Sequence, residues 1–398
     1  MNYRGQSARR INASARRPAV APGGVIRFAA GLYLAQTQPG LEGVAWSEIA
    51  FRCGASGAAR ELARRTIGDR AGATIFHAER IDSLRALRSV EDLFALVGYR
   101  RFAPANPAAP ARPGAALERV RAAVHDARHI DEALETRARF TPGGRAGRRI
   151  QFRVVARMAG DHEFRRVDFR RAVENAMVER GDHVWRLADD EAGADVEFWA
   201  TMLPGEFLLA LRLSDERMRH REYKAAHLPG SLRPAVAAAM AWLSEPAEHD
   251  VTLDPFCGAG TVLVERAHLG RYAKLIGGDS DPAALAAARE NIGPRHQPLE
   301  LHEWNATALP LARACVTKVV TNLPWGRRHG SHEENLALYP RALAELRRVA
   351  APGATFVILT ADSRLMDQAI RRERMRPERI FRVAILGAPA TIYVMRNS

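Results

Sequence analysis

The sequence contains few cysteines, few lysines and no long apolar segment, and each scarcity excludes a class of protein or site. The cysteines, Cys53, Cys257 and Cys315, lie far apart and form no CxxC pair, which excludes a disulfide framework and indicates a reducing compartment. No apolar run approaches the roughly 18 residues that cross a membrane. We therefore expect a cytoplasmic protein with no membrane partner.

Lysine occurs only at Lys224, Lys274 and Lys318, whereas arginine is abundant. Genomic base composition can exchange lysine for arginine, but it does not remove acidic residues. The formal net charge is nevertheless +14 over 398 residues. Such an excess of positive charge favours a polyanionic partner, with nucleic acid ahead of an anionic membrane surface.

Composition along the chain divides it into five parts. Residues 1–24 contain arginines and no acid, which resembles a transit peptide, but we interpret them as a basic disordered tail. Residues 103–116 are rich in proline and alanine, as expected of a semi-rigid linker. The other three parts, residues 25–102, 117–215 and 216–398, are each long enough to fold as a domain.

The first two predicted domains mix strands and helices, so each is expected to be a small α+β unit. In the first, residues 26–37 predict a strand, and residues 42–54 and 80–99 have helical spacing. The predicted elements of the second are a helix at 117–130, a strand at 149–158, a helix at 169–181 and strands at 194–203 and 205–213.

Arginines gather in the second unit. They lie before and within its first strand and at the start of its second helix. The members of this group that we expect to contact RNA are Arg145, Arg148, Arg149, Arg165 and Arg166.

Residues 216–398 alternate strands with helices. The predicted strands are 251–254, 273–279, 316–322 and 354–362, the helices between them are 259–269, 282–292 and 334–350, and residues 379–386 and 390–396 predict a closing antiparallel hairpin. Regular alternation implies an α/β fold with a parallel, doubly wound, Rossmann-like sheet. Ligands of such sheets bind at the carboxyl ends of the strands.

The first of these strands leads into a glycine turn, DPFCGAGTVLVE, at residues 254–265. A dinucleotide site would need a third glycine where Leu263 stands, and a P-loop would need a lysine that is absent. A smaller anion, such as the carboxylate of an amino acid, fits the helix N-terminus that follows. The residues expected to bind it are Asp254, Pro255, Phe256, Gly258, Gly260 and Thr261.

Polar side chains also follow the next two strands. Asp279 ends the second strand, about where an acid binds two ribose hydroxyls, and Ser280 follows it. Asn305, followed by Ala306, falls where a further strand, before the one predicted at 316–322, should end, and it can pair with a base edge. A carboxylate site, a ribose acid and a base-reading amide together describe S-adenosylmethionine as the cofactor.

The strand predicted at 316–322 ends in the sequence NLPW, residues 322–325. The Asn322 side chain and the Leu323 carbonyl are two acceptors for the N–H groups of a base amine, and Asn322 also borders the predicted cofactor site. Pro324 stiffens the turn, and Trp325 provides a surface for stacking. These four residues are therefore our candidates for catalysis by direct methyl transfer.

Other reactive side chains have simpler explanations. Cys257 lies in the glycine turn, which accounts for it without a role as nucleophile. His125 and His129 are one helical turn apart in the predicted helix, but no third ligand is near them, so we expect no metal site.

These motifs resemble those of THUMP-domain RNA guanine-N2 methyltransferases, the tRNA branch especially. The glycine turn, Asp279, Asn305 and the stretch NLPWGRRHGSHEENLALYP carry the resemblance, and residues 221–240 are similar to the lead-in of the family's methyltransferase domain. It implies a ferredoxin-like unit at 25–102, a THUMP domain at 117–215, a monomer, and docking near the tRNA acceptor stem. Separately from the resemblance, Arg327 and Arg328 follow the NLPW corner, and we expect them to contact a substrate phosphate rather than only face solvent. Many relatives carry Asp at the position of Asn305, and the resemblance implies that the side-chain oxygen of either residue accepts from the adenine amino group.

Other substrates remain open at this stage. A 23S rRNA guanine-N2 methyltransferase would differ only in its RNA, and methylation of adenine N6 or glutamine N5 needs the same polarisation of an amine. A non-catalytic RNA-binding protein with a relic methyltransferase fold is the alternative outside enzymes.

Overall fold

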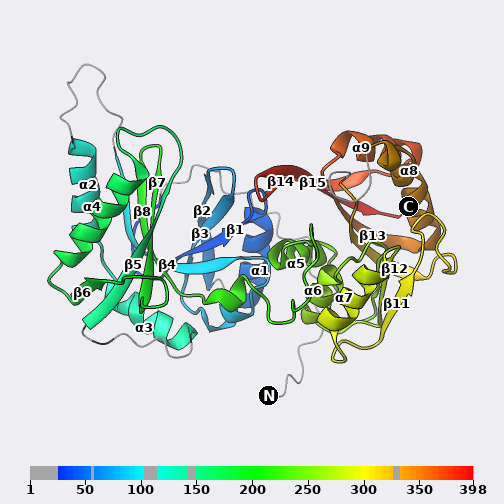
Figure 1. Cartoon of the computed structure of the whole chain (residues 1–398), viewed down its shortest axis with the longest axis horizontal. Helices are drawn as coiled ribbons and strands as arrows, with labels where there is room; N and C mark the ends of the chain where they lie inside the picture. The colour runs from blue at the N-terminus through cyan, green and yellow to red at the C-terminus, as the bar shows by residue number, and fades with distance from the viewer. Residues whose placement is uncertain are drawn as a thin grey trace. The chain divides into compact units, whose positions relative to one another are not determined.

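The computed structural model describes residues 26–54, 58–102, 114–141, 147, 149–325 and 332–397. They form two compact units, and the division falls between Arg219 and His220. Figure 1 labels the helices and strands of both. The predicted tail, most of the predicted linker, and the candidate residues Arg145, Arg148, Arg327 and Arg328 lie outside the described residues.

The N-terminal unit contains one eight-stranded sheet, in the order β2-β3-β1-β4-β8-β7-β5-β6. Its strands are β1 (Leu32–Thr37), β2 (Ala59–Ile67), β3 (Ala71–Ala78), β4 (Asp92–Arg101), β5 (Arg149–Met158), β6 (Val184–Leu187), β7 (Val196–Leu203) and β8 (Glu206–Arg212). The antiparallel pairing of β4 with β8 joins the two stretches that the sequence predicts as separate α+β units. The strands of both stretches therefore share one sheet.

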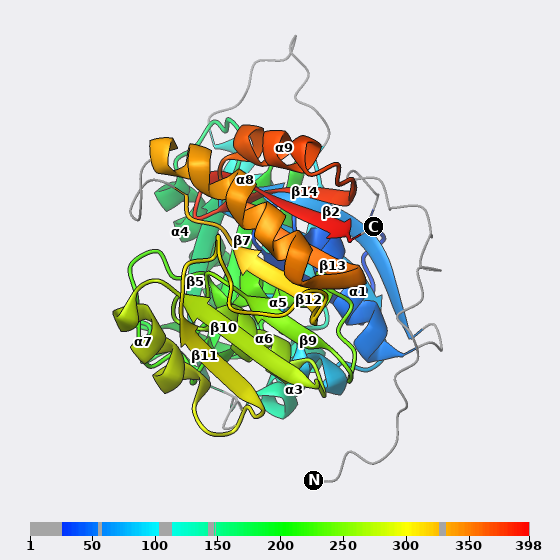
Figure 2. The same cartoon turned by 90° about the vertical axis from the view of Figure 1, so that its right-hand side faces the viewer.

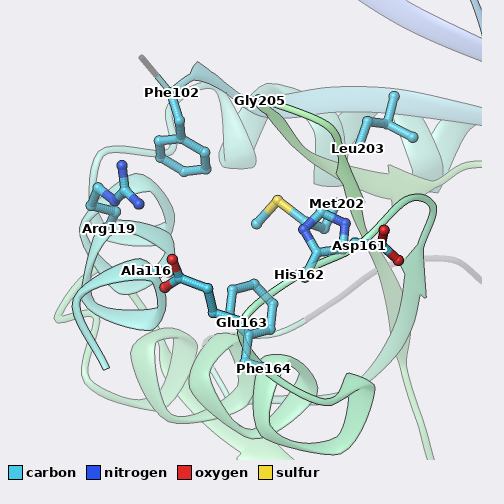
Figure 3. Close-up of a pocket in the computed structure, with 10 residues that line it drawn as sticks. All are labelled: Phe102, Ala116, Arg119, Asp161, His162, Glu163, Phe164, Met202, Leu203 and Gly205. Atoms are coloured by element: carbon cyan, nitrogen blue, oxygen red, sulfur yellow. The ribbon is translucent and has the colours of Figure 1, made fainter. Parts of the chain in front are cut away.

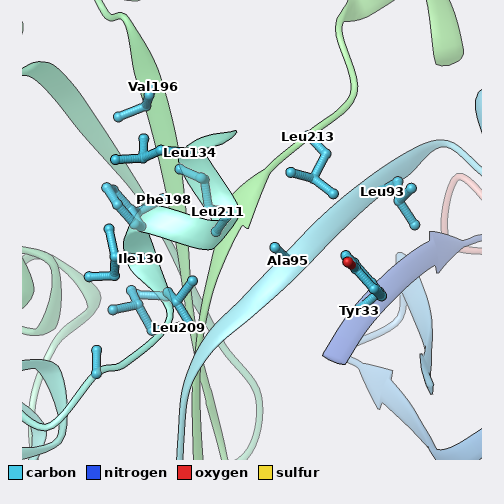
Figure 4. Packing of buried hydrophobic residues seen from close by; sticks show 14 of the residues in the cluster. Tyr33, Leu93, Ala95, Ile130, Leu134, Val196, Phe198, Leu209, Leu211 and Leu213 are labelled. Atoms are coloured by element: carbon cyan, nitrogen blue, oxygen red, sulfur yellow. The ribbon is translucent and has the colours of Figure 1, made fainter. Parts of the chain in front are cut away.

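Helices cover one face of this sheet. They are α1 (Glu42–Cys53), the 3-10 helix η1 (Asp82–Ala86), α2 (Ala115–His125), α3 (Ile130–Phe140) and α4 (Arg166–Val178), with a second 3-10 turn, η2, at Glu216–Met218. Figure 4 shows the core beneath them, where Tyr33 of β1 and Ala95 of β4 belong to the same buried cluster as Phe198 and Leu209. One continuous core explains why the two stretches fold as one unit.

Two predictions for this unit are wrong. The helix expected at 80–99 is the 3-10 helix η1 followed by the central strand β4. Because β4 buries Phe94 on one face of the sheet and Leu93 and Ala95 on the other, its run of apolar residues imitates helical spacing. The helix expected at 117–130 ends at His125, and α3 begins a separate helix.

The C-terminal unit confirms the predicted α/β architecture. Its strands are β9 (Val251–Asp254), β10 (Lys274–Asp279), β11 (Leu299–Glu303), β12 (Val316–Asn322), β13 (Ala350–Thr360), β14 (Pro377–Ile385) and β15 (Ala388–Arg396). They form one sheet in the order β11-β10-β9-β12-β13-β15-β14. The strands from β11 to β13 are parallel, and β14 and β15 form the predicted antiparallel hairpin.

Helices cover both faces of the C-terminal sheet. They are α5 (Pro234–Leu243), α6 (Thr261–His268), α7 (Pro282–Ile292), α8 (His332–Val349) and α9 (Ser363–Arg372). Side chains of α6 and α7 form one buried cluster with the sheet, and those of α8 and α9 form another. Figure 2 shows α8 and α9 running side by side. The sheet order reverses beside β9, where ligands of such folds bind.

A buried ionic group holds the amino ends of β9 and β12 against α6. Arg266 of α6 is 0% exposed, and its Nη2 donates to Asp250 Oδ2 at 3.1 Å and to the Ala247 carbonyl at 2.7 Å. Lys318 of β12 lies on the other side of Asp250 and donates to the Ser244 carbonyl at 2.7 Å. Each buried charge therefore has an opposite charge or several oxygen partners.

Arg266→Ala should destabilise the protein by about 3–5 kcal/mol, because it leaves the buried Asp250 carboxylate with weaker partners. The measurement is the free energy of unfolding in urea. Arg271→Ala, at an exposed position, is the control and should change it little. A loss below about 1 kcal/mol for Arg266→Ala would contradict the role given to this ion pair.

Candidate functional site

The predicted site residues lie along one edge of the C-terminal sheet. Asp279, Asp254 and Asn322 end β10, β9 and β12, which are neighbours in the sheet. Asn305 lies two residues beyond the end of β11, the next strand outward. The structure therefore brings together side chains that are separated by up to 68 residues, from Asp254 to Asn322.

The glycine turn fits tightly on one side and is open on the other. Gly260 has φ 75°, and a Cβ there would lie 2.9 Å from Ile292 Cδ1 of α7. Gly258 has φ 51°, and a Cβ there would meet nothing within 4 Å. Both values favour glycine. The open side at Gly258 is the place where a ligand can approach the backbone before α6 begins.

The turn is fixed by its contacts with β10 and α7. The Gly258 N–H donates to Asp279 Oδ2 at 3.0 Å, and the Cys257 N–H donates to the Gly278 carbonyl at 2.8 Å. Asn291 of α7 donates to the Ala259 carbonyl at 3.0 Å. Asn291 was not predicted as a site residue, because only the fold brings α7 to the turn.

Asn291 also links this turn to the segment before α5. Its Oδ1 accepts from the Ala226 N–H at 2.9 Å, and its Nδ2 donates to the Ala226 carbonyl at 3.0 Å. Nearby, the Tyr223 hydroxyl donates to Glu265 Oε1 at 2.7 Å. The segment at 221–240 therefore supports the glycine turn through Asn291 of α7.

Asp279 is oriented by backbone N–H groups. Besides the Gly258 N–H, it accepts from the Asp281 N–H at 3.1 Å through Oδ1. Asp281 in turn caps α7 by accepting from the Ala283 N–H at 2.8 Å. Each Asp279 oxygen retains a second lone pair, so the half-buried carboxylate can still accept from two hydroxyl groups. Ser280 beside it is exposed.

Trp304 packs directly on the glycine before Asp279. A Cβ at Gly278 would lie 1.6 Å from Trp304 Nε1, so only glycine leaves room for the indole. The backbone N–H of Trp304 donates to the Asp279 carbonyl at 3.1 Å, which fixes the start of the loop that carries Asn305. Neither Gly278 nor Trp304 was predicted, although the GGD sequence at the strand end is a signal for such a close contact.

Asn305 presents its amide nitrogen rather than its oxygen. Its Oδ1 accepts from both the N–H and the hydroxyl of Thr307, each at 2.9 Å. The side chain is exposed, and the neighbouring Ala306 is buried. We expected the oxygen of Asn305 to accept from a base amine; in this conformation the group that faces a ligand is the Nδ2 donor.

The NLPW corner is held from α8. Asn335 Nδ2 and the Tyr339 hydroxyl donate to the Pro324 carbonyl at 3.0 Å and 2.7 Å. Asn335 and Tyr339 are four residues apart on one helix face, and both are buried. Their spacing in the sequence could have revealed them, but their target could not be known without the fold.

Inside the corner, the Trp325 indole forms a hydrogen bond with Asn322, one of the candidates for catalysis. Trp325 Nε1 donates to Asn322 Oδ1 at 2.9 Å, and both side chains are half-buried. The Leu323 N–H donates to the Leu359 carbonyl at 2.9 Å, and the Leu323 side chain is buried. In the described residues no hydrogen-bond donor contacts the Leu323 carbonyl. The corner thus offers two oxygen acceptors, one of them shared with the indole.

Burial changes the ionisation of the two groups behind the turn. Burial raises the pKa of Asp254 to about 7 and Asp279 adds to the effect, while the Thr321 hydroxyl, at 2.7 Å, and the Phe256 N–H oppose it. Burial likewise raises the pKa of the Cys257 thiol. A thiolate nucleophile at Cys257 is therefore disfavoured.

The RNA-contact candidates that the structure describes are on the N-terminal unit. Arg149 begins β5, while Arg165 and Arg166 lie at the start of α4; all three are exposed. Arg165 also donates to Asp168 at 3.0 Å. Within the described ranges we find no group of three His, Cys, Asp or Glu side chains arranged for a metal, and no helix with the length and apolarity to cross a bilayer.

The domain that carries the site is similar to known methyltransferases. Residues 221–389 match the UPF0020 family, described as an RMKL-like methyltransferase domain. The chain is 31% identical over 265 residues to mouse tRNA (guanine(6)-N(2))-methyltransferase THUMP3, covering 62% of this chain and 52% of that protein. It is 29% identical over 240 residues to the tRNA (guanine(6)-N2)-methyltransferase of Thermus thermophilus, covering 60% and 70%. The chain thus spans about half the length of the mammalian relatives.

Two solved structures share the fold. TrmN from Thermus thermophilus has a TM-score of 0.70 at 23% identity and covers 92% of this chain and 99% of its own. SMU.472, a putative methyltransferase complexed with SAH, has a TM-score of 0.65 at 14% identity and covers 92% and 98%. At these identities the match establishes a shared architecture over nearly the whole chain.

The stability of the protein should depend on pH through Asp254. The unfolded carboxyl ionises near its ordinary pKa of 3.8, but the folded one ionises only near 7, so folding stability falls as pH rises between these values. Asn cannot ionise, so the free energy of unfolding of Asp254→Asn should fall less with rising pH than that of the wild type. The difference between the two falls should be roughly 4 kcal/mol. Urea unfolding of both proteins at pH 4 and pH 8 measures it.

The exposed Asp69→Asn serves as the matched control and should leave the pH dependence unchanged. Equal pH dependence in the wild type and Asp254→Asn would contradict the raised pKa.

Proposed function

We propose, on the premise that residues 221–389 are an RMKL-like methyltransferase domain, that this chain is an S-adenosylmethionine-dependent enzyme that methylates N2 of a guanosine in tRNA. The observation that carries the proposal is the NLPW corner beside the glycine turn, with acceptors at Asn322 and Leu323. The names of the mouse and Thermus thermophilus relatives support guanine N2 in tRNA as the target. A position near the acceptor stem is the finer part of the proposal.

The residues at the sheet edge fit S-adenosylmethionine. The open side of Gly258 and the N-terminus of α6, with Pro255, Phe256, Gly260 and Thr261 around them, would hold its amino-acid end. Asp279, with Ser280 beside it, would accept from the ribose hydroxyls, and Asn305 and Ala306 would meet the base. When bound, S-adenosylmethionine supplies a methyl group on a positively charged sulfur.

The protein's task is to make a poor nucleophile reactive. The lone pair of the guanine amine is delocalised into the ring, so it attacks weakly. Asn322 Oδ1 and the Leu323 carbonyl would accept from its two N–H groups and favour a pyramidal nitrogen with an available lone pair. Neither residue forms a covalent bond, so catalysis arises from positioning and polarisation.

Trp325 and α8 set the geometry of those acceptors. The indole donates to Asn322 Oδ1 and so fixes the amide with its oxygen directed into the corner. Asn335 and Tyr339 donate to the Pro324 carbonyl and hold it in place. The Leu323 carbonyl, not the Pro324 carbonyl, is therefore left to accept from the amine. A guanosine paired in RNA must leave its helix before it can reach the corner.

The N-terminal unit would bind the RNA. Its mixture of helices and strands and its exposed arginines support the assignment of a ferredoxin-like part at 25–102 and a THUMP part at 117–215. Phosphate contacts by Arg149, Arg165 and Arg166 need no base sequence, so they would position the RNA rather than select it. Arg145, Arg148, Arg327 and Arg328 would add to these contacts.

The name of a further relative supports a second candidate substrate, a small nuclear RNA. Bovine U6 snRNA (guanine-N(2))-methyltransferase THUMPD2 is 32% identical over 134 residues, which is 33% of this chain. Mass spectrometry of digested tRNA, rRNA and small RNA from a strain that lacks the protein and from its parent distinguishes the substrates. Loss of N2-methylguanosine from tRNA supports the proposal, and loss from another RNA alone refutes it.

Asn322→Ala should lower kcat for methyl transfer by about 100- to 1000-fold, because one polarising acceptor is lost. Binding of tRNA, measured by fluorescence anisotropy, should stay within about twofold. Gln368→Ala, an exposed amide on α9, is the control and should change neither quantity. Parallel losses of transfer and RNA binding would show that Asn322 has a structural role instead.

Replacing Arg165 and Arg166 with alanine should weaken tRNA binding and reduce its dependence on salt. Each lost phosphate contact lowers the slope of log K against log salt concentration by about 0.7–0.9. Arg70→Ala, in the exposed turn between β2 and β3, should leave the slope unchanged. An unchanged slope in the double variant would remove these two arginines from the RNA-binding surface.

A further inference from the structure

Asn305 opens a turn at residues 305–308, and this turn fixes the direction of its side-chain amide. The Ala308 N–H donates to the Asn305 carbonyl at 2.9 Å. The side-chain Oδ1 of Asn305 accepts from the N–H and from the hydroxyl of Thr307, each at 2.9 Å. Because a backbone N–H can only donate, the amide atom that faces Thr307 is the oxygen. The turn therefore sets the orientation of the amide before any ligand binds.

These contacts leave the Asn305 side chain able to donate but not to accept. An amide oxygen has two lone pairs, and Thr307 uses both. The other polar atom, Nδ2, is part of an exposed side chain and has no acceptor within the part of the chain that the structure describes. An aspartate in its place would keep one oxygen on Thr307 and direct its second oxygen outward. Asparagine therefore replaces an outward acceptor with an outward donor.

The turn is anchored at both ends, so the Nδ2 donor has a defined position. At one end the backbone N–H of Trp304 donates to the Asp279 carbonyl at 3.1 Å. At the other end the Leu309 N–H donates to Glu345 Oε1 of α8 at 2.7 Å, and the same oxygen accepts from Arg348 at 2.7 Å. The Trp304 and Leu309 side chains are both buried. A ligand therefore meets an amide on a rigid support.

The position of Asn305 suits the base of a nucleoside whose ribose is held by Asp279. Asp279 ends β10, and Asn305 follows β11, the neighbouring strand. Neighbouring strands lie about 4.8 Å apart, which is comparable to the step from a ribose to its base. The base would therefore present one edge to the Nδ2 donor.

We propose that Asn305 donates an Nδ2 hydrogen to a ring nitrogen of the cofactor's adenine, and that the cofactor site does not require the 6-amino group. The inference rests on the proposed function, because it concerns the S-adenosylmethionine site of the same enzyme. The ring nitrogens of adenine are acceptors, whereas its amino group is a donor that Nδ2 cannot satisfy. Since the Asn305 side chain is exposed, the amino group would be left to solvent.

A reversed amide would have to give up the contacts that define the turn. To accept from the adenine amino group, Asn305 would turn its oxygen outward and its Nδ2 toward Thr307. Nδ2 would then oppose the Thr307 N–H, donor against donor, and both of the present hydrogen bonds would be lost. An aspartate accepts in both directions and has no such conflict. The residue at position 305 therefore decides whether the amino group is recognised.

The test is isothermal titration calorimetry of the full chain with two ligands. One is S-adenosylhomocysteine, and the other is its analogue with hydrogen in place of the 6-amino group. The wild type should bind both with Kd values within about threefold of each other. Asn305→Asp should bind the analogue at least about tenfold more weakly than S-adenosylhomocysteine, because its outward oxygen accepts from the amino group. A tenfold or larger loss for the analogue in the wild type would overturn the proposal.

Asn305→Ala tests the donor itself. Removal of Nδ2 should weaken both ligands by the same factor, about fivefold, and leave their ratio near one. Asn175→Asp, at an exposed amide on α4 of the N-terminal unit, is the matched control and should reproduce both wild-type Kd values. Wild-type affinity in Asn305→Ala would also overturn the proposal.

A cavity in the N-terminal unit provides a control for the place of binding. Its volume is about 410 Å³, and Figure 3 shows its Asp161 and Glu163 carboxylates on opposite sides, so they do not meet at one ligand group. His162 also lines it, and its ring stacks on Phe164 with centroids 5.7 Å apart. His162→Ala should change neither Kd. A weakening of both ligands by His162→Ala would place the purine there and contradict the role given to Asn305.

Methyl transfer to tRNA by the wild type is measured separately. Transfer by an enzyme that rejects the analogue would refute the role of Asn305 and leave the proposed function standing. Equal binding of both ligands without transfer to any RNA would do the reverse. A wild type that binds neither ligand would overturn both.

Discussion

The parallel pairing of β9 with β12 is the constraint on which the C-terminal unit depends. The chain runs from β9 outward to β10 and β11, then returns to place β12 on the other side of β9. Side chains fasten this pair at both ends: Thr321 donates to Asp254 at the carboxyl end, and Thr317 and Lys318 meet Asp250 at the amino end. Without it, the glycine turn and the NLPW corner would not share an edge.

Along the same edge of the sheet, the glycine turn and the NLPW corner are held by different secondary-structure elements. The glycine turn is bound by β10 in front and by α7 behind. The NLPW corner is bound by α8, whose buried Asn335 and Tyr339 reach the Pro324 carbonyl. A site assembled from four strand ends therefore relies on helices from both faces of the sheet for its rigidity.

Local patterns predicted the C-terminal unit well, because each of its strands and turns is specified by neighbouring residues. The glycine turn, Asp279 and the NLPW corner follow strands that are obvious from alternation with helices. The wrong helix at 80–99 arose where a strand is buried on both faces, so tertiary pairing rather than periodicity decides its structure. Asn291, Asn335 and Trp304 escaped prediction for a related reason: their partners lie on other elements.

The contact between Gly278 and Trp304 has a consequence for how this sequence can change. The indole occupies the volume that any side chain at position 278 would need. A larger residue at 278 is tolerated only after 304 has become smaller, and a smaller residue at 304 opens a cavity unless 278 has grown. Substitutions at positions 278 and 304 are therefore coupled, and a natural or designed variant of this sequence must change both residues together.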